Sequence, residues 1–250
     1  MKKMLFKLLP VTRRKASFIL LLLYWPAIFV LTHIFLPQSV LLQMKASDKA
    51  LHFLVYFILA VLLWFSISID KKASLRSKKF WLVFLLLVIY AAADEWLQGV
   101  FAGRTRDFMD FVWNVCGVAA GLVIVLLFSF RPAVLVAAGI SILVFTNAVR
   151  IQFTGHLAFI RPAFLLLSLG FFTFFWCRIL TSFQPLKQSC LKWLAASAAL
   201  PALLVAAVKI LTFIMGRNFE LTDFLLSAAA ILTVIVIMFF IKGRFANSIT

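Results

Sequence analysis

Long apolar runs constrain this sequence more than any other feature. They recur along all 250 residues and leave no stretch long enough for a sizeable soluble domain. A helix needs about 20 residues to cross a hydrocarbon core of about 30 Å. Hydrophobic residues make up 65% of the chain and charged residues 13%, well below the share of about a quarter in soluble proteins. The sequence therefore predicts an all-α integral membrane protein, a polytopic bundle of transmembrane helices.

The apolar runs predict about eight spanning helices. Polar or proline-containing segments separate the runs, as expected at the ends of membrane helices. The basic start of the chain has no small-residue cleavage motif after it, so we expect an anchor that is retained. The predicted spans cover residues 17–36, 51–69, 80–98, 107–130, 133–149, 163–180, 191–215 and 221–241.

The distribution of charge indicates how the predicted bundle is oriented. Lys and Arg gather at the N-terminus, around residues 70–79 and 178–192, and at the C-terminus. Cytoplasmic connections retain such residues, so both termini are predicted to be cytoplasmic. All acidic residues except Asp70 then lie towards the extracytoplasmic face. The net charge of +17 reflects this topology, and no nucleic-acid partner is predicted.

A polar stretch between two of these spans, residues 94–121, holds most of the chemistry. Asp107, Asp110, Asn114, Gly117 and Gly121 follow one another at spacings of 3, 4, 3 and 4, which places them on one helix face. The Gly-x-x-x-Gly pair predicts the close approach of another helix backbone. We therefore expect this helix to combine a polar surface with a tight packing contact.

Two further helix ends carry polar residues at helical spacing. Steps of three and four residues bring each set onto one face. The sets are Asp94, Glu95 and Gln98 near the end of 80–98, and Asp48, His52 and Tyr56 at the start of 51–69. We expect the three polar stripes to meet in one space at the extracytoplasmic face.

Four short motifs follow one another in the first half of the chain. They are D-K-x-x-H-F-x-x-Y-F at 48–57, D-E-x-x-Q at 94–98, G-R-x-x-D at 103–107 and D-x-x-x-N-x-x-G-x-x-x-G at 110–121. Each is weak alone, but together and in this order they resemble the VanZ-like family. The predicted domains are a VanZ-like four-helix transmembrane unit, 1–130, and four further transmembrane helices of unknown role, 131–250.

The resemblance carries expectations about location and biology. It implies a multi-pass protein of the bacterial cytoplasmic (inner) membrane that belongs to the cell envelope. It also implies a connection with glycopeptide resistance, where the family is linked to reduced teicoplanin susceptibility. No reaction is implied, so whether this chain is an enzyme stays open.

Four residues are the candidates for catalysis. A carboxylate within a spanning helix is costly unless it is paired, hydrated or protonated, which favours a function for Asp94, Glu95 and Asp110. Histidine is the side chain that changes charge near neutral pH, so His52 is the predicted general acid or base. Asp94 or Glu95 is predicted to orient it.

Eight residues are predicted to bind a ligand. They are Asp48, Lys49, Tyr56, Gln98, Arg104, Arg106, Asp107 and Asn114. Arg104 and Arg106 offer planar donor groups suited to phosphate or carboxylate, although they equally suit ion pairs with nearby acids. Asp48 and Asp107 lie at helix starts, so a structural capping role is an alternative for both.

Neither a metal nor a cofactor is predicted. The three cysteines form no CxxC or Cys/His cluster, and zinc sites usually use more than one histidine. An oxygen-rich magnesium or calcium site from Asp94, Glu95 and Asp110 is the alternative. Tyr56 and Asn114 equally suit hydrogen bonds between helices.

The sequence therefore favours a pocket that binds or modifies one class of ligand. That ligand is a membrane lipid or an anionic lipid-linked molecule of the cell envelope, held at the outer face. One alternative is a proton-coupled carrier in which the buried acids are protonation sites. Another is a non-enzymatic scaffold whose polar stripes hold helices together. The oligomeric state does not follow from the sequence.

Overall fold

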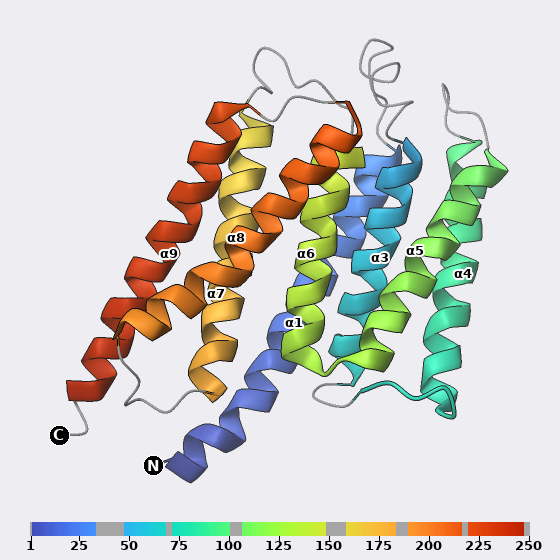
Figure 1. Ribbon diagram of the computed structural model, residues 1–250. Coiled ribbons are helices and arrows are strands. Elements are labelled where there is room, and N and C mark those ends of the chain that lie inside the picture. The colour runs from blue at the N-terminus through green and yellow to red at the C-terminus, as the bar shows by residue number, and fades with distance from the viewer. Residues whose placement is uncertain are drawn as a thin grey trace. The chain divides into compact units, whose positions relative to one another are not determined.

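The computed structural model describes residues 2–33, 48–68, 72–100, 107–148, 159–183, 190–216 and 220–247. Within these ranges the chain forms eight α-helices and no strand, which confirms the predicted all-α class. The helices are α1 (Lys2–His33), α3 (Asp48–Ile67), α4 (Lys78–Gln98), α5 (Phe108–Leu127), α6 (Phe130–Ala148), α7 (Ile160–Phe183), α8 (Cys190–Ile214) and α9 (Leu221–Asn247) (Figure 1).

Seven of the described helices, all except α1, are long and apolar enough to cross a membrane. The chain is therefore a multi-pass membrane protein, as predicted. Within the first predicted span, 17–36, the apolar stretch of the described residues is Lys15–Val30, and residues 34–36 lie outside the described part of the chain. The cytoplasmic location of both termini stays a prediction.

Contacts divide the chain into two compact units. The N-terminal unit comprises residues 1–137 and 148–150, and the C-terminal unit comprises residues 138–147 and 151–250. The division falls inside α6, whose first turns contact the N-terminal unit, where Phe130 packs edge-on against Phe65. The predicted limits of the two regions, 1–130 and 131–250, stay a prediction about their separate roles.

Helix α3 lies at the core of the N-terminal unit, in contact with α1, α4 and α5 (Figure 1). Its side chains include the fully buried Tyr56. Two glycines let α5 approach its backbone. A Cβ atom on Gly121 would lie 2.6 Å from the Phe57 carbonyl oxygen, and one on Gly117 would overlap the Phe53 carbonyl. The structure thus confirms the close approach that the Gly-x-x-x-Gly pair predicts.

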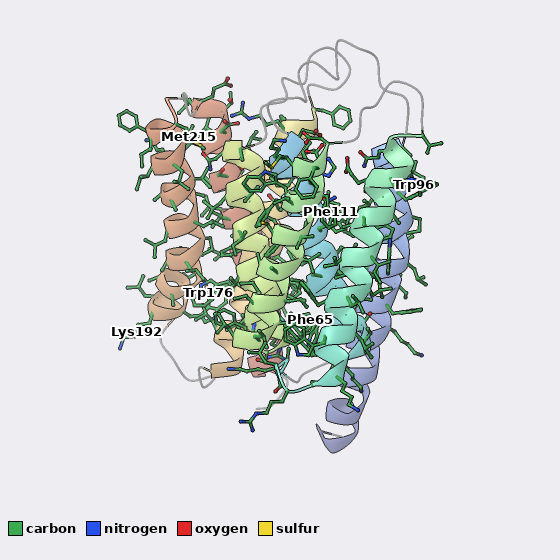
Figure 2. All side chains as sticks on the ribbon, turned by 90° about the vertical axis from the view of Figure 1, so that its right-hand side faces the viewer. Phe65, Trp96, Phe111, Trp176, Lys192 and Met215 are labelled. Carbon is green, nitrogen blue, oxygen red and sulfur yellow. The ribbon has the colours of Figure 1, made fainter. Side chains whose placement is uncertain are left out.

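The last turn of α4 and the first turn of α5 meet at one end of the N-terminal unit, which we call the polar end. The main-chain N–H of Asp107 donates to Glu95 Oε1 on α4, with 3.1 Å between the atoms. The Asp107 side chain caps α5 by accepting from the Met109 N–H. Figure 2 shows Trp96 towards this end and Phe65 towards the opposite end. Trp96 is exposed, as is common at membrane–water interfaces.

In the C-terminal unit, α7 packs against α8 and α9. Four buried hydroxyl groups of this unit donate to the carbonyl oxygens four residues earlier in their own helices. These hydroxyls belong to Thr173, Ser197, Thr212 and Ser227. Thr212 also bonds to Asn147 of α6. An ion pair between Arg161 and Asp223 joins the start of α7 to the start of α9.

Candidate functional site

His52 lies in the second turn of α3 and faces α5. Its Nδ1 atom is 3.0 Å from the side-chain oxygen of Asn114, and both residues are buried. An amide oxygen only accepts hydrogen bonds, so His52 Nδ1 is the donor. In the neutral ring, Nε2 therefore carries the lone pair. The fold thus fixes which ring nitrogen is available for chemistry.

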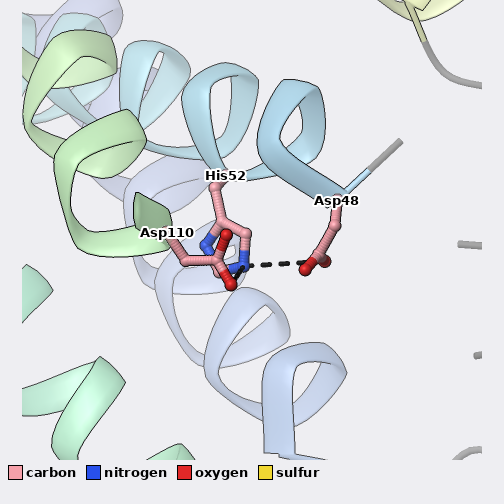
Figure 3. A group of neighbouring side chains, drawn as sticks. All are labelled: Asp48, His52 and Asp110. Atoms are coloured by element: carbon pink, nitrogen blue, oxygen red, sulfur yellow. Dashed lines mark ion pairs between the residues drawn. The ribbon is translucent and has the colours of Figure 1, made fainter. Parts of the chain in front are cut away.

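Two carboxylates flank the available nitrogen of His52. Asp48 Oδ1, one helical turn earlier on α3, and Asp110 Oδ2 on α5 each lie 3.7 Å from Nε2 (Figure 3). Asp110 is almost fully buried, whereas Asp48 is partly exposed. The polar end therefore places one imidazole nitrogen between two carboxylate groups that come from different helices.

Lys49 lies on the exposed side of the same group. Its Nζ atom is 3.1 Å from Asp107 Oδ2 and 3.5 Å from Asp110 Oδ1. Donation from the Met109 main-chain N–H, with the Lys49 ammonium beside it, holds the pKa of the Asp107 carboxyl below its ordinary value. Asp107 therefore both caps α5 and forms an ion pair with Lys49. Its predicted ligand-binding role stays a prediction.

Asp94 is fully buried on α4 and faces a different set of side chains. Gln98 donates to Asp94 Oδ2 at 3.3 Å, and His33 Nδ1 at the end of α1 lies 3.9 Å from Oδ1. The buried hydroxyl of Tyr56 interacts electrostatically with Asp94 without completing a hydrogen bond within the described residues. Asp94 is therefore the point where α1, α3 and α4 meet.

This arrangement corrects one prediction from the sequence. Asp94 or Glu95 was expected to orient His52, but the hydrogen-bonding partner of the ring is Asn114. The reason is helical register, because His52 faces α5 while Asp94 faces His33 on α1. His33 is a site residue that the sequence prediction missed. It lies at the end of α1 with no spacing pattern that links it to the other polar residues.

Glu95 connects the two groups of side chains. Its Oε1 accepts from the Asp107 N–H, and its Oε2 is buried without a hydrogen-bond partner among the described residues. Glu95 and Asp94 both interact electrostatically with His52, and Glu95 also interacts with Asp110. The side chains therefore form one continuous group, which we call the polar cluster. Its members are His33, Asp48, Lys49, His52, Tyr56, Asp94, Glu95, Gln98, Asp107, Asp110 and Asn114.

The structure thus brings together every candidate site residue from the sequence that lies in its described part. Arg104 and Arg106 lie outside the described residues. The catalytic and ligand-binding roles of all these residues stay predictions. Within the described cluster, five carboxyl groups accompany one lysine.

An apolar hollow lies beside the polar cluster, between α1 and α4. Its volume is about 480 Å³, and its lining includes Leu21, Trp25, Phe29 and Tyr90. Phe29 stacks on His33 with 4.2 Å between ring centroids, and Tyr90 packs against Tyr56 at 5.8 Å. In each contact, one ring lines the hollow and the other ring belongs to the polar cluster. The hollow and the polar cluster are therefore neighbours.

Comparison with known proteins identifies one family. No curated protein and no solved structure is significantly similar to the chain. The model of the VanZ/LLP1 family matches residues 6–129, a range that contains all the predicted site residues. The match confirms the resemblance that the sequence motifs indicate. The N-terminal half of this chain belongs to the VanZ/LLP1 family.

Proposed function

We propose that the N-terminal unit binds a membrane lipid or a lipid-linked molecule of the bacterial cell envelope in the cytoplasmic membrane. The ligand's polar part lies at the polar cluster and its apolar part lies in the hollow between α1 and α4. One observation carries this proposal. A hollow lined by apolar and aromatic side chains adjoins a buried group of ionisable residues through Phe29 and Tyr90. An amphipathic ligand likewise has an apolar part and a polar part.

Unsatisfied polar atoms support a ligand in addition to a packing role. The Tyr56 hydroxyl, the Asn114 amide nitrogen and Glu95 Oε2 are buried without hydrogen-bond partners among the described residues. Buried polar atoms in proteins are almost always paired, and each unpaired one has a cost. A pure scaffold has no reason to retain three such atoms together, whereas a ligand headgroup would satisfy them.

The charge of the cluster limits which headgroups suit it. An anionic headgroup, as the sequence predicts, is repelled by the carboxylates unless cations stand between them. Lys49 supplies one such cation at the exposed edge. Arg104 and Arg106 belong by sequence to the connection between α4 and α5. A phosphate-type headgroup would therefore bind at the Lys49 side of the cluster.

Modification of the ligand would use His52. Asn114 holds the ring so that Nε2 is the proton acceptor, and Asp110 stabilises the imidazolium that forms. The acids weigh against a proton-coupled carrier, because Asp94, Glu95 and Asp110 all lie at one end of the unit. A relay across the membrane needs acceptors along its path.

Co-purified lipid tests the proposal. The whole chain would be purified in mild detergent, and bound lipids identified by native mass spectrometry. We expect a headgroup-selective lipid that is lost in Phe29→Ala and His52→Ala. Phe171→Ala is the matched control, because Phe171 is an exposed phenylalanine of the C-terminal unit. Retention of the same lipid by all three variants, or no selective lipid in the unaltered protein, would refute the proposal.

A further inference from the structure

We propose that Asp48, His52 and Asp110 bind a divalent metal ion, with Zn²⁺ as the ion that fits best. Each residue offers one ligand atom, and these atoms all lie within 4.8 Å of one another. Figure 3 shows the carboxylates of Asp48 and Asp110 beside the His52 ring. A nitrogen and two carboxylate oxygens form a ligand set that zinc accepts.

The distances favour an ion over a direct hydrogen bond. Both carboxylate oxygens are 3.7 Å from His52 Nε2. A charge-assisted hydrogen bond would close to about 2.8 Å. Two ligand atoms around a tetrahedral zinc ion lie roughly 3.4 Å apart, given zinc–ligand bonds of about 2.1 Å. The two distances from Nε2 to the carboxylate oxygens would therefore shorten by only a few tenths of an ångström to hold the ion.

The orientation of His52 is what a metal ligand requires. Histidines that bind metals commonly donate the other ring N–H to an oxygen, which fixes the ring and its tautomer. Asn114 performs this role at 3.0 Å, and it leaves the Nε2 lone pair directed between the two carboxylates. Lone pairs that face one another in this way repel unless a proton or a metal ion lies between them.

Burial gives a second and independent indication of a missing cation. His52 is only 6% exposed, and its Nε2 makes no hydrogen bond within the described part of the chain. Asp110 already uses Oδ1 for Lys49, which leaves Oδ2 on the side of His52. A cation would satisfy the lone pair of His52 Nε2 and offset the two carboxylates.

The fold shows why the sequence predicts no metal. Asp48 is four residues before His52 and suits a helix cap, while Asp110 is 58 residues further along the chain. Only the close packing of α3 on α5, at Gly117 and Gly121, brings Asp110 to His52. The ligand set thus depends on a tertiary contact that spacing alone does not reveal.

The metal would also define the ligand of the proposed lipid site, a step that rests on the proposed lipid binding. With the ion on Nε2, His52 would act as a metal ligand in place of its role as a base. Three protein ligands leave one position of a tetrahedral zinc ion open for a water molecule or a ligand oxygen. A phosphate-type headgroup could then approach an acidic cluster, because the ion supplies positive charge where the carboxylates would otherwise repel it.

Direct zinc binding tests the inference. The full chain would be purified in detergent, treated with a chelator, dialysed and titrated with ZnCl₂ by calorimetry, with MgCl₂ as a parallel titration. We expect about one Zn²⁺ per chain. His52→Ala and Asp48→Asn should abolish this binding, and Asn114→Ala should weaken it by about 10- to 100-fold. Glu220→Gln is the matched control for Asp48→Asn and should bind zinc normally, since Glu220 is an exposed acid of the C-terminal unit.

The outcomes separate this inference from the lipid proposal. Circular dichroism and size-exclusion profiles would show that each variant is folded, and Asp48→Asn changes a partly exposed side chain at a helix start. Zinc binding that is absent, or equal in the unaltered protein and folded Asp48→Asn, overturns the metal site. Selective lipid that survives chelation then leaves the lipid proposal intact. Zinc binding without any selective lipid supports the metal site and refutes the lipid proposal.

Discussion

In the C-terminal unit, four buried hydroxyl groups bond to carbonyl oxygens of their own helices, and one of them, Thr212, also bonds to Asn147 of α6. In the N-terminal unit, buried ionisable side chains reach across to other helices. Ser197 and Ser227 bond to positions four residues earlier. By contrast, His52 bonds to Asn114 of α5, and Asp94 lies near His33 of α1. Bonds within one helix satisfy a polar group wherever that helix packs, but bonds between helices fix a spatial arrangement.

Buried polar atoms without hydrogen bonds among the described residues occur in both units, since the hydroxyls of Thr146 and Ser168 in the C-terminal unit are also unpaired there. Those of the N-terminal unit belong to a group of ionisable side chains. The polar cluster keeps Tyr56, Asn114 and Glu95 with buried atoms that lack hydrogen bonds among the described residues. Such atoms lower the stability of a protein unless something else binds them. We infer that the unpaired polar atoms of the N-terminal unit lower its stability but form part of a binding site. The hydrogen-bonded hydroxyl groups of the C-terminal unit described above stabilise helix packing. The following predictions test this contrast.

The largest effect is expected from Gly117→Ala. The added Cβ would overlap the Phe53 carbonyl, so α3 and α5 must separate, at a cost of about 3 kcal/mol in the free energy of unfolding. Gly170→Ala in the C-terminal unit is the matched control. Its Cβ would meet only Val234 Cγ2 at 3.7 Å, an ordinary contact. Unfolding in detergent by circular dichroism measures both, and equal stability of the two variants would contradict the close packing.

An intermediate effect should distinguish two buried aspartates. Asp223→Asn removes the ion pair with the half-exposed Arg161 and should lower the free energy of unfolding by about 1 kcal/mol. Asp94→Asn should leave stability within about 0.5 kcal/mol, since a buried carboxylate is itself costly, yet reduce bound lipid. Thermal unfolding and native mass spectrometry measure the two properties. A loss of stability in Asp94→Asn with lipid retained would favour the scaffold.

The smallest effect concerns pH and Asp107. The pKa of this carboxyl is lower in the folded protein, because it accepts from the Met109 N–H and pairs with Lys49. Its charge therefore stabilises the fold above the unfolded pKa of about 3.9, and this contribution is lost as the pH falls through the folded value. Asp107→Asn keeps a capping oxygen but no charge. The difference in melting temperature between the two proteins should shrink below about pH 3.9, and a constant difference would disprove the assignment.

Helical periodicity was sufficient to predict the spans, the close contact at Gly117 and the convergence of the polar stripes, because these depend on residues within one helix. Which side chains of two different helices contact each other depends on the register and the rotation of those helices. The spacing of residues within one helix does not reveal either. His33 was missed for this reason, and Asn114 was not expected to orient His52.

The backbone contact between α3 and α5 has a consequence for how a ligand enters. At Gly117 and Gly121 the two helices leave no room even for a methyl group, so they cannot part without losing their main packing contact. The path of entry therefore lies elsewhere. The hollow between α1 and α4 adjoins the polar cluster beside Phe29 and Tyr90. On the proposed function, a lipid would therefore enter sideways from the bilayer, between α1 and α4.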